Sequence, residues 1–179
     1  MRVISGKYKG KILQGFDIRG TRPTMDRVKE SMIASIYSYL KDAVVLDLFA
    51  GSGSLGIEAL SNGCKMCYFI DNNKIAIETI QKNIQNIDSA FILKEDCFAA
   101  LQYFKNNQIT FDAIFLDPPY HDNLLNNVID KIYEYQLLNK EGILICEYEE
   151  GECKARFPLL KSKKYGLKKV DIYQNSEKI

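Results

Sequence analysis

The sequence has no tryptophan, one histidine and only four prolines among its 179 residues. Its longest apolar stretch has five residues, which excludes a membrane-spanning helix of about 20 apolar residues. The first residues lack the apolar core of a secretory signal peptide, so the chain is expected to stay in the cytoplasm. The length suits one domain with a hydrophobic core and a small extension.

The chain has five cysteines, an odd number that cannot be paired completely in disulfides. In a reducing cytoplasm such thiols stay free. Cys64 and Cys67 have the spacing of a metal or redox motif, but residues 65–71 have a strand pattern, in which positions three apart point to opposite faces. With one histidine and no second cysteine pair to complete a zinc site, the sequence predicts no bound metal.

The net charge of +1 conceals an uneven distribution along the chain. Residues 1–41 and residues 154–179 each carry a net charge of +6, whereas residues 42–153 carry −11. If the two basic ends meet in space, they form a patch that suits a polyanion such as a nucleic acid. If they stay apart, they are solvated tails, and the sequence leaves both interpretations open.

Strand and helix patterns alternate from residue 43 to residue 148. This alternation predicts an α/β fold with a doubly wound, mainly parallel, Rossmann-like sheet, in which ligands bind beyond the carboxyl ends of the strands. Residues 1–22 are expected to form an N-terminal β-hairpin extension, followed by a helix, and residues 23–179 the main domain. Seven strands are expected, at 43–49, 65–71, 90–96, 111–117 and 142–148 and as a pair hinged near Gly166.

A glycine-rich loop follows the first of these strands. Gly51, Gly53 and Gly56 form a G-x-G-x-x-G pattern that indicates a nucleoside cofactor, although nicotinamide enzymes share it. Asp47 lies inside the strand, where a carboxylate suits a cationic ligand better than a pyrophosphate. It could equally order the loop by accepting hydrogen bonds from its N–H groups, and both roles can hold together.

Acidic residues also end the next two strands. Asp71 lies twenty residues beyond Gly51, a position suited to accepting both hydroxyls of a ribose. Asp96 could reach the amino group of an adenine. Either residue alone would more ordinarily cap a helix, but acids at several strand ends that face one crevice favour a binding site. Glu147, near the end of the fifth strand, is expected to support the crevice.

These motifs resemble a known enzyme class. "VLDLFAGSGSLGIEAL", "FIDNN", "EDCF" and "FLDPPY", in this order, are similar to the motif series of class I S-adenosylmethionine-dependent methyltransferases. "RVISGKYKGKIL", "TRPTMDRVKESM" and "KKYGLKKVDIY" resemble the 16S ribosomal RNA (guanine-N2-)-methyltransferase family, although Leu167-Lys168-Lys169 stands where smaller or acidic residues are expected. The resemblance implies S-adenosylmethionine as cofactor, bound by Asp47, Phe49, Ala50, Gly51, Ser52, Gly53, Gly56, Asp71, Asn72, Asp96 and Cys97.

The resemblance also implies a catalytic role for the stretch Asp117, Pro118, Pro119 and Tyr120. A carboxylate and a backbone carbonyl can turn an exocyclic amine toward the methyl group, and consecutive prolines stiffen the backbone that presents them. Tyr120 offers a ring on which the base can stack. His121 is not required as a base, because the amine can lose its proton to water or to Asp117.

A guanine edge cannot be reached inside a helix, so the substrate base must lie in a loop or be extruded. The expected partner is small-subunit ribosomal RNA, either naked or in an assembling subunit with ribosomal proteins, and the enzyme is expected to act as a monomer. The candidate RNA-binding residues are Lys7, Tyr8, Lys9, Lys11, Arg22, Arg27 and Lys29.

Three alternatives remain. An adenine-N6 methyltransferase acting on nucleic acid would share the D-P-P-Y motif, which does not by itself select the base. A nicotinamide oxidoreductase would explain the glycines but not D-P-P-Y. A non-catalytic RNA-binding ribosome assembly factor would explain the basic ends but not the intact Asp117 and glycine loop.

Overall fold

The computed structural model describes residues 1–15, 23–119, 123–149 and 151–176. The strands are β1 (Val44–Asp47), β2 (Met66–Asp71), β3 (Ala90–Lys94), β4 (Phe111–Leu116), β5 (Leu138–Tyr148), β6 (Leu159–Tyr165) and β7 (Lys168–Gln174). The helices are α1 (Pro23–Ile36), α2 (Ser54–Ser61), α3 (Lys74–Asn83), α4 (Cys97–Asn106) and α5 (Leu124–Glu134), with a short 3-10 turn η1 (Tyr37–Tyr39).

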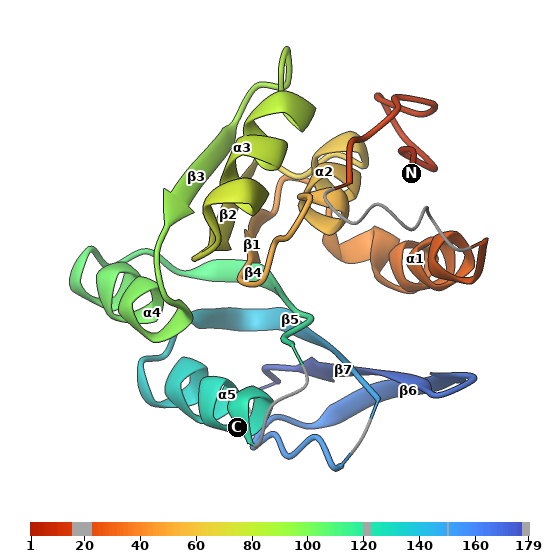
Figure 1. Ribbon diagram of the computed structural model, residues 1–179. Coiled ribbons are helices and arrows are strands. Elements are labelled where there is room, and N and C mark those ends of the chain that lie inside the picture. The colour runs from red at the N-terminus through yellow and green to blue at the C-terminus, as the bar shows by residue number, and fades with distance from the viewer. Residues whose placement is uncertain (16–22, 120–122, 150, 177–179) are drawn as a thin grey trace.

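The strands form one seven-stranded sheet in the order β3-β2-β1-β4-β5-β7-β6 (Figure 1). Strands β1 to β5 pair in parallel, and β7 runs antiparallel to both β5 and β6. The predicted doubly wound, mainly parallel sheet is therefore confirmed. Strand β5 begins earlier than predicted, because Phe111 pairs with Leu138 before the register shifts.

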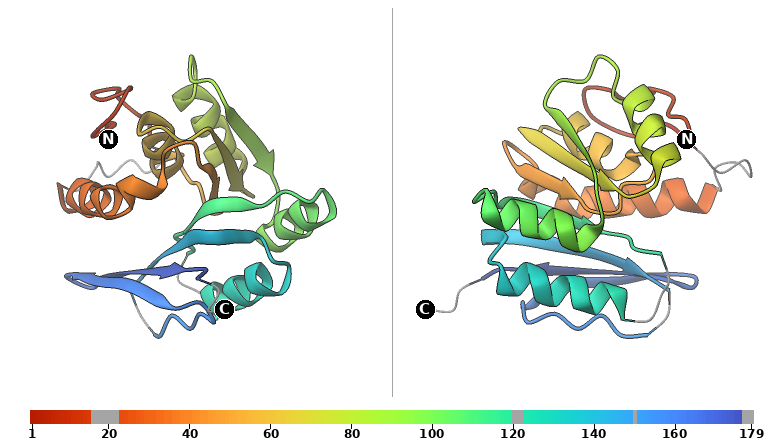
Figure 2. Two further views of the ribbon diagram at one scale, coloured as in Figure 1. Left: turned by 180° about the vertical axis from the view of Figure 1, so that it is seen from behind. Right: turned by 60° about the vertical axis from the view of Figure 1, so that its left-hand side comes forward.

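Helices cover both faces of the sheet (Figures 1 and 2). Successive residues of β1 point to opposite faces, so Val45 packs with residues of α1, α2 and α3, and Leu46 packs with residues of α4 and α5. Both sides of the central strands are thus buried, which explains why these strands read as continuous apolar runs. The helices hold the strand ends, and hence the loops after them, in fixed positions.

The N-terminal segment differs from the predicted two-stranded hairpin. It is a turn closed by a single antiparallel bridge between Arg2 and Ile12, with Gly6 and Gly10 at positive φ. Val3 and Leu13 belong to the same hydrophobic cluster as α1, α2 and α3. Val3 N donates to Lys11 O and Leu13 N donates to Met1 O, both at 2.9 Å, whereas the turn between them bonds to α2, as in the 2.7 Å hydrogen bond from Lys7 N to Ser61 O. Residues 1–15 therefore share the core of the main domain.

The two basic ends of the chain meet in space. The Lys163 Nζ of β6 lies 3.1 Å from the Ser31 Oγ of α1, and Lys161 Nζ lies 3.3 Å from Ser35 Oγ. A 2.5 Å hydrogen bond joins Ser31 Oγ to the Tyr165 hydroxyl. Figure 1 shows α1 and the β6–β7 hairpin on the same side of the molecule. The condition for a shared basic surface, left open by the sequence, is therefore met.

All five cysteines are free, as predicted, and four of them are buried. None of the helices in the described ranges is long and apolar enough to cross a membrane. Within those same ranges, no three His, Cys, Asp or Glu side chains are grouped so that they could hold a metal ion.

Candidate active site

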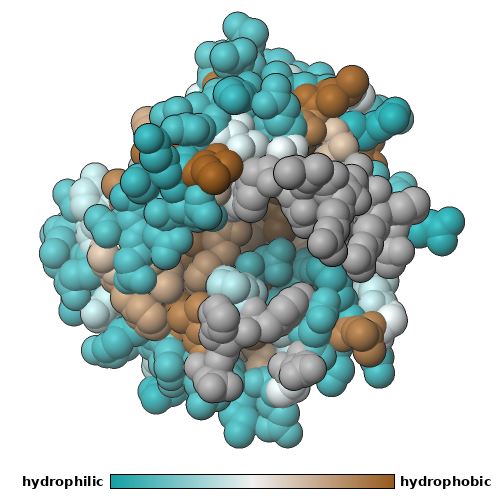
Figure 3. Space-filling model, in the orientation of Figure 1, coloured by the Kyte–Doolittle hydropathy of each residue, from teal (hydrophilic) through white to brown (hydrophobic). Residues whose placement is uncertain are grey.

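A pocket of about 520 Å³ opens beyond the carboxyl ends of β1 and β4. These strands are neighbours at the point where the strand order reverses, which is where open α/β sheets bind ligands. Figure 3 shows a hollow near the centre of this face, with hydrophilic and apolar residues on its walls. The pocket is lined by Met1, Gly15, Asp26, Val28, Lys29, Met32, Asp47, Phe49, Ala50, Gly51, Ser52, Ser54, Leu55, Asp117, Glu147 and Lys168.

The glycine-rich loop forms one wall of this pocket, between β1 and α2. Gly51 and Gly53 have φ values of 56° and 82°, which side-chain-bearing residues rarely adopt. A Cβ atom on Gly56 would come within 2.3 Å of the Phe69 ring. Gly51 and Gly53 thus shape the turn, and Gly56 allows α2 to pack closely on β2.

Asp47 performs the loop-ordering role that the sequence left open. Its buried Oδ2 accepts a 3.0 Å hydrogen bond from the Gly56 N–H. Burial raises the pKa of Asp47 to about 7, although this hydrogen bond lowers the pKa and the negative charge of Asp71 raises it further. Asp47 also lines the pocket, so the same carboxylate lies close to any cationic group bound there.

Asp71 and Asp96 are both engaged with backbone N–H groups. Asp71 Oδ2 accepts a 2.9 Å hydrogen bond from Gly51 N, and Oδ1 accepts one of the same length from Asn73 N. Asp96 is exposed and caps α4, with Oδ1 accepting from Phe98 N at 2.9 Å. The helix-cap interpretation therefore holds for Asp96, and each carboxylate keeps lone pairs that could accept from a ligand.

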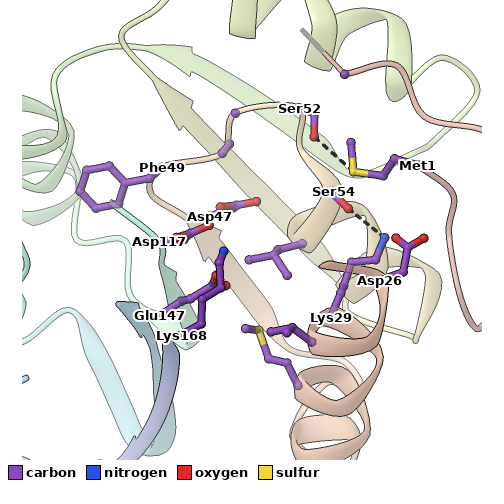
Figure 4. Close-up of a pocket in the computed structure, with 16 residues that line it drawn as sticks. Met1, Asp26, Lys29, Asp47, Phe49, Ser52, Ser54, Asp117, Glu147 and Lys168 are labelled. Carbon is purple, nitrogen blue, oxygen red and sulfur yellow. Dashed lines mark hydrogen bonds and ion pairs between the residues drawn. The ribbon is translucent and has the colours of Figure 1, made fainter. Parts of the chain in front are cut away.

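The other predicted cofactor-binding residues surround the same crevice. Ala50 and Ser52 belong to the glycine loop and line the pocket. Phe49 is half-buried, and its ring points away from the pocket carboxylates (Figure 4). Asn72 is exposed after β2, and Cys97 is buried at the start of α4, where burial raises the pKa of its thiol to about 11.

Asp117 directly follows β4 and lines the same pocket as the glycine loop. Its side chain is half-buried, Pro118 is buried and Pro119 is exposed. Burial raises the pKa of Asp117 to about 7, and the negative charge of Glu147 adds to this rise, whereas the ammonium of Lys168 opposes it. Tyr120 and His121 lie outside the described residues.

The structure adds a residue that sequence reasoning missed. Lys168, the first residue of β7, donates a short hydrogen bond to Glu147 Oε1, and both side chains line the pocket with Asp117. In Figure 4 these side chains converge from three strands. The signal in the sequence was the unexpected Leu167-Lys168-Lys169 stretch, but only the antiparallel pairing of β7 with β5 brings Lys168 beside Glu147.

The structure contradicts the prediction that Lys29 binds RNA. Lys29 is 6% exposed, and its Nζ lies 3.2 Å from Glu58 Oε1, 2.9 Å from Arg2 O and 2.9 Å from Ser54 Oγ. These acceptors match the three N–H donors of an ammonium group, which leaves none for a phosphate. Lys29 is therefore a structural residue that joins α1 to α2 and to the N-terminal segment.

The remaining candidates for RNA binding lie nearer the surface. Lys7, Lys9 and Arg27 are exposed. Lys11 is half-buried and donates to the Gln85 carbonyl at 3.2 Å. Tyr8 is half-buried and packs against the core, with the Lys7 ammonium 5.2 Å from its ring centre. Arg22 lies outside the described residues.

The fold and site together define a class I methyltransferase, the enzyme class whose cofactor is S-adenosylmethionine. The defining features are the strand order, the glycine loop after β1 and the Asp-Pro-Pro turn after β4. Comparisons with known proteins lead to the same class.

Residues 1–174 match the family model described as Conserved hypothetical protein 95, and the chain belongs to this family. YlbH of Bacillus subtilis (strain 168), named as a provisional rRNA methyltransferase, is 39% identical over 97% of this chain and 98% of its own. Ribosomal RNA small subunit methyltransferase D of Haemophilus influenzae is 34% identical over 98% of this chain and 94% of its own. The structure of yhhF from Escherichia coli, described as a provisional methyltransferase, matches with a TM-score of 0.87 at 28% identity over 98% of both chains.

Proposed function

We propose that the protein transfers a methyl group from S-adenosylmethionine to the N2 amine of a guanine in small-subunit (16S) ribosomal RNA. The observation that carries the proposal is the position of Asp117. It follows β4, and its carboxylate and the glycine loop after β1 line the same pocket. An acceptor for an amine and a candidate cofactor loop are thus on neighbouring strands.

The pocket residues fit S-adenosylmethionine better than a dinucleotide. Asp47, Asp117 and Glu147 place three carboxyl groups around it, and their ionised forms favour a sulfonium and an ammonium and repel a pyrophosphate. The positive φ values of Gly51 and Gly53 keep the main chain of the loop accessible to a ligand. We propose that Asp71, beside this loop, accepts from the ribose hydroxyls. When bound, the cofactor supplies an electrophilic methyl group.

Asp117 provides the chemistry that the acceptor needs. The lone pair of an exocyclic amine is delocalised into the base, so the amine must be turned and partly pyramidalised before it can attack. A carboxylate oxygen of Asp117 and the Pro118 carbonyl can accept its two N–H groups and hold it in that orientation. Because burial raises the pKa of Asp117 to about 7, the same group can take up the proton released after transfer. We retain the stacking role of Tyr120 as a prediction.

The surface around the pocket supports an RNA substrate. Exposed cations from both chain ends, including Lys9 and Arg27 in the first segment and Lys161 and Lys164 in the last, lie on segments joined by the α1–β6 contacts. Such a surface attracts phosphates, and the recessed Asp117 requires a base that is unpaired or extruded. We propose residues 1–22 as part of this RNA-binding surface. Because residues 1–15 share the core, single substitutions such as Lys9→Met test this role better than a truncation.

Ribosomal RNA as the substrate is supported by the names of the relatives. One is named as a ribosomal RNA small subunit methyltransferase and another as a provisional rRNA methyltransferase. Adenine remains the competing base, because an Asp-Pro-Pro-Tyr motif suits any exocyclic amine. A protein-bound subunit and naked RNA are both compatible with an open pocket.

The test is transfer of label from methyl-labelled S-adenosylmethionine to unmodified 16S RNA, offered naked and in small-subunit particles. After digestion to nucleosides, we expect the label in N2-methylguanosine. The Asp117→Ala variant should transfer label at no more than about 1% of the wild-type rate. Label on N6 of adenine, or on DNA or protein alone, would overturn the substrate assignment. Calorimetric binding of NADH in place of S-adenosylmethionine would overturn the enzyme class.

A further inference from the structure

In the function proposed so far, Glu147 contributes only its charge to the pocket, and its ion-pair partner Lys168 has no role. Glu147 is 6% exposed near the end of β5, and Lys168 begins β7. The ammonium of Lys168 is held against Glu147 Oε1 by a short hydrogen bond. Both side chains line the pocket with Asp117, and Figure 4 shows the three converging.

The charges around this point are unbalanced. Asp117 faces Glu147 and Glu149 from β5 and its end, and Asp47 from β1. Lys168 is the cation that faces Asp117 from β7. Lys29, the other cation that lines the pocket, is fully engaged with Glu58, Ser54 and Arg2. Among the side chains of the described residues, four carboxylates are thus gathered around the Lys168 ammonium, so loss of this positive charge should raise the pKa of Asp117.

We propose that Lys168 is a positioning residue that keeps Asp117 ionised for methyl transfer, with Glu147 holding the ammonium in place. The inference rests on the proposed role of Asp117 as the acceptor for the amine. An ionised carboxylate offers both oxygens as acceptors and can take up the proton that the amine releases, whereas a protonated one is a weaker acceptor for an N–H group and cannot take up that proton. In this role Lys168 acts through Asp117 and not on the reacting atoms.

The electrostatics of the site agree with this geometry. Like charges raise the pKa of Asp117 and the Lys168 ammonium lowers it. Burial lowers the pKa of Lys168, but the hydrogen bond to Glu147 and the nearby carboxylates outweigh burial and raise it above its ordinary value. Lys168 therefore stays charged through the pH range in which Asp117 titrates.

The test measures two quantities, the acidic limb of the pH profile of kcat/KM and the titration of Asp117 by NMR in protein with ¹³C-labelled aspartate carboxyls. An opposite charge at close range lowers a carboxyl pKa by about 1–3 units, so Lys168→Met should move the limb upward by about one pH unit. Below the limb this means about tenfold slower methylation, and the rates should converge at high pH. Lys168→Arg should restore the profile.

Glu147→Gln should move the limb in the opposite direction, because it removes a negative charge beside Asp117. Lys168→Met leaves Glu147 buried without its partner, so the double variant Lys168→Met/Glu147→Gln provides a folded reference with neither charge, whose limb should fall between those of the single variants. Lys65→Met is the matched control, because it removes the same charge from an exposed lysine that precedes β2 and lies outside the proposed RNA-binding surface. It should leave the limb in place.

If the wild type is active, and Lys168→Met has the same acidic limb and the same Asp117 titration as the wild type, the inference is overturned. Equal losses in Lys168→Met and Lys168→Arg at every pH would also overturn it, since these would indicate a structural role alone. A wild type that methylates no RNA would instead refute the proposed function. In that case the NMR titration still decides whether Lys168 controls the ionisation of Asp117.

Discussion

The substitution Lys29→Met tests how the N-terminal segment is attached to the methyltransferase domain. Glu58 is fully buried, and its Oε1 accepts from Lys29 Nζ at 3.2 Å and from the Ile4 N–H at 2.6 Å. Its Oε2 has no hydrogen-bond partner among the described residues. Methionine keeps the length of the side chain but leaves the Glu58 carboxylate buried with a single donor.

The expected loss follows from the cost of isolating a buried charge. Removing one partner of a buried ion pair destabilises a protein by about 3–5 kcal/mol, a large part of a typical total of about 5–15 kcal/mol. For a domain of this size that loss lowers Tm by about 6–20 °C. Lys9→Met, which removes an exposed cation from the same segment, should cost less than about 0.5 kcal/mol.

The assay is urea unfolding followed by far-UV circular dichroism, because the protein lacks tryptophan as a fluorescent probe. The midpoint should fall with an unchanged m-value. Adding Glu58→Gln to Lys29→Met removes the unpaired buried charge and should recover most of the lost free energy of unfolding. The comparison gives a coupling energy between the two sites. The reasoning is refuted if Lys29→Met unfolds like the wild type while its KM for RNA rises several-fold. That result would reinstate Lys29 as a phosphate contact.

Three further predictions concern the pocket. Asp117→Ala should lower turnover by about two to three orders of magnitude with little change in S-adenosylmethionine affinity measured by calorimetry; normal turnover would remove Asp117 from its proposed role. Gly53→Val should abolish cofactor binding in the same calorimetric assay, because φ is 82° there and an added Cβ lies 3.3 Å from the Phe69 ring; wild-type affinity would contradict this. Because the pKa of Asp117 is raised from 3.8 to about 7 on folding, its contribution to stability is full below about pH 4 and is lost as the pH rises to about 7. Asp117→Asn should therefore flatten the dependence of the free energy of unfolding on pH between 4 and 7 and stabilise the protein at pH 8, and an unchanged slope in urea titrations would count against the raised pKa.

Local sequence patterns were sufficient to predict the order of the helices and strands and the positions of the motif residues at strand ends. The glycines after β1 and Asp117 after β4 come together because the carboxyl ends of parallel neighbouring strands lie at one edge of the sheet. That rule needs only the strand pattern and the position of each residue at a strand end. The same rule explains why the fold class could be predicted.

Partners on distant parts of the chain could not be predicted in this way. Lys29 reads as an exposed cation in a basic stretch, yet it is buried against Glu58, 29 residues further along the sequence. The N-terminal residues read as a separable hairpin, but Val3 and Leu13 lie in the main core. Nothing in their local pattern states which surface will cover them.

The sequence alone therefore determined where the glycine loop and Asp117 lie, since both positions depend on local backbone geometry at strand ends. The tertiary structure decided the electrostatics of the site, because the antiparallel return of β7 brings Lys168 to Glu147 and Asp117. It also decided that the two basic ends adjoin, through contacts between α1 and β6. The interaction between two charges depends on their distance and burial, and neither quantity can be obtained from the order of the residues alone.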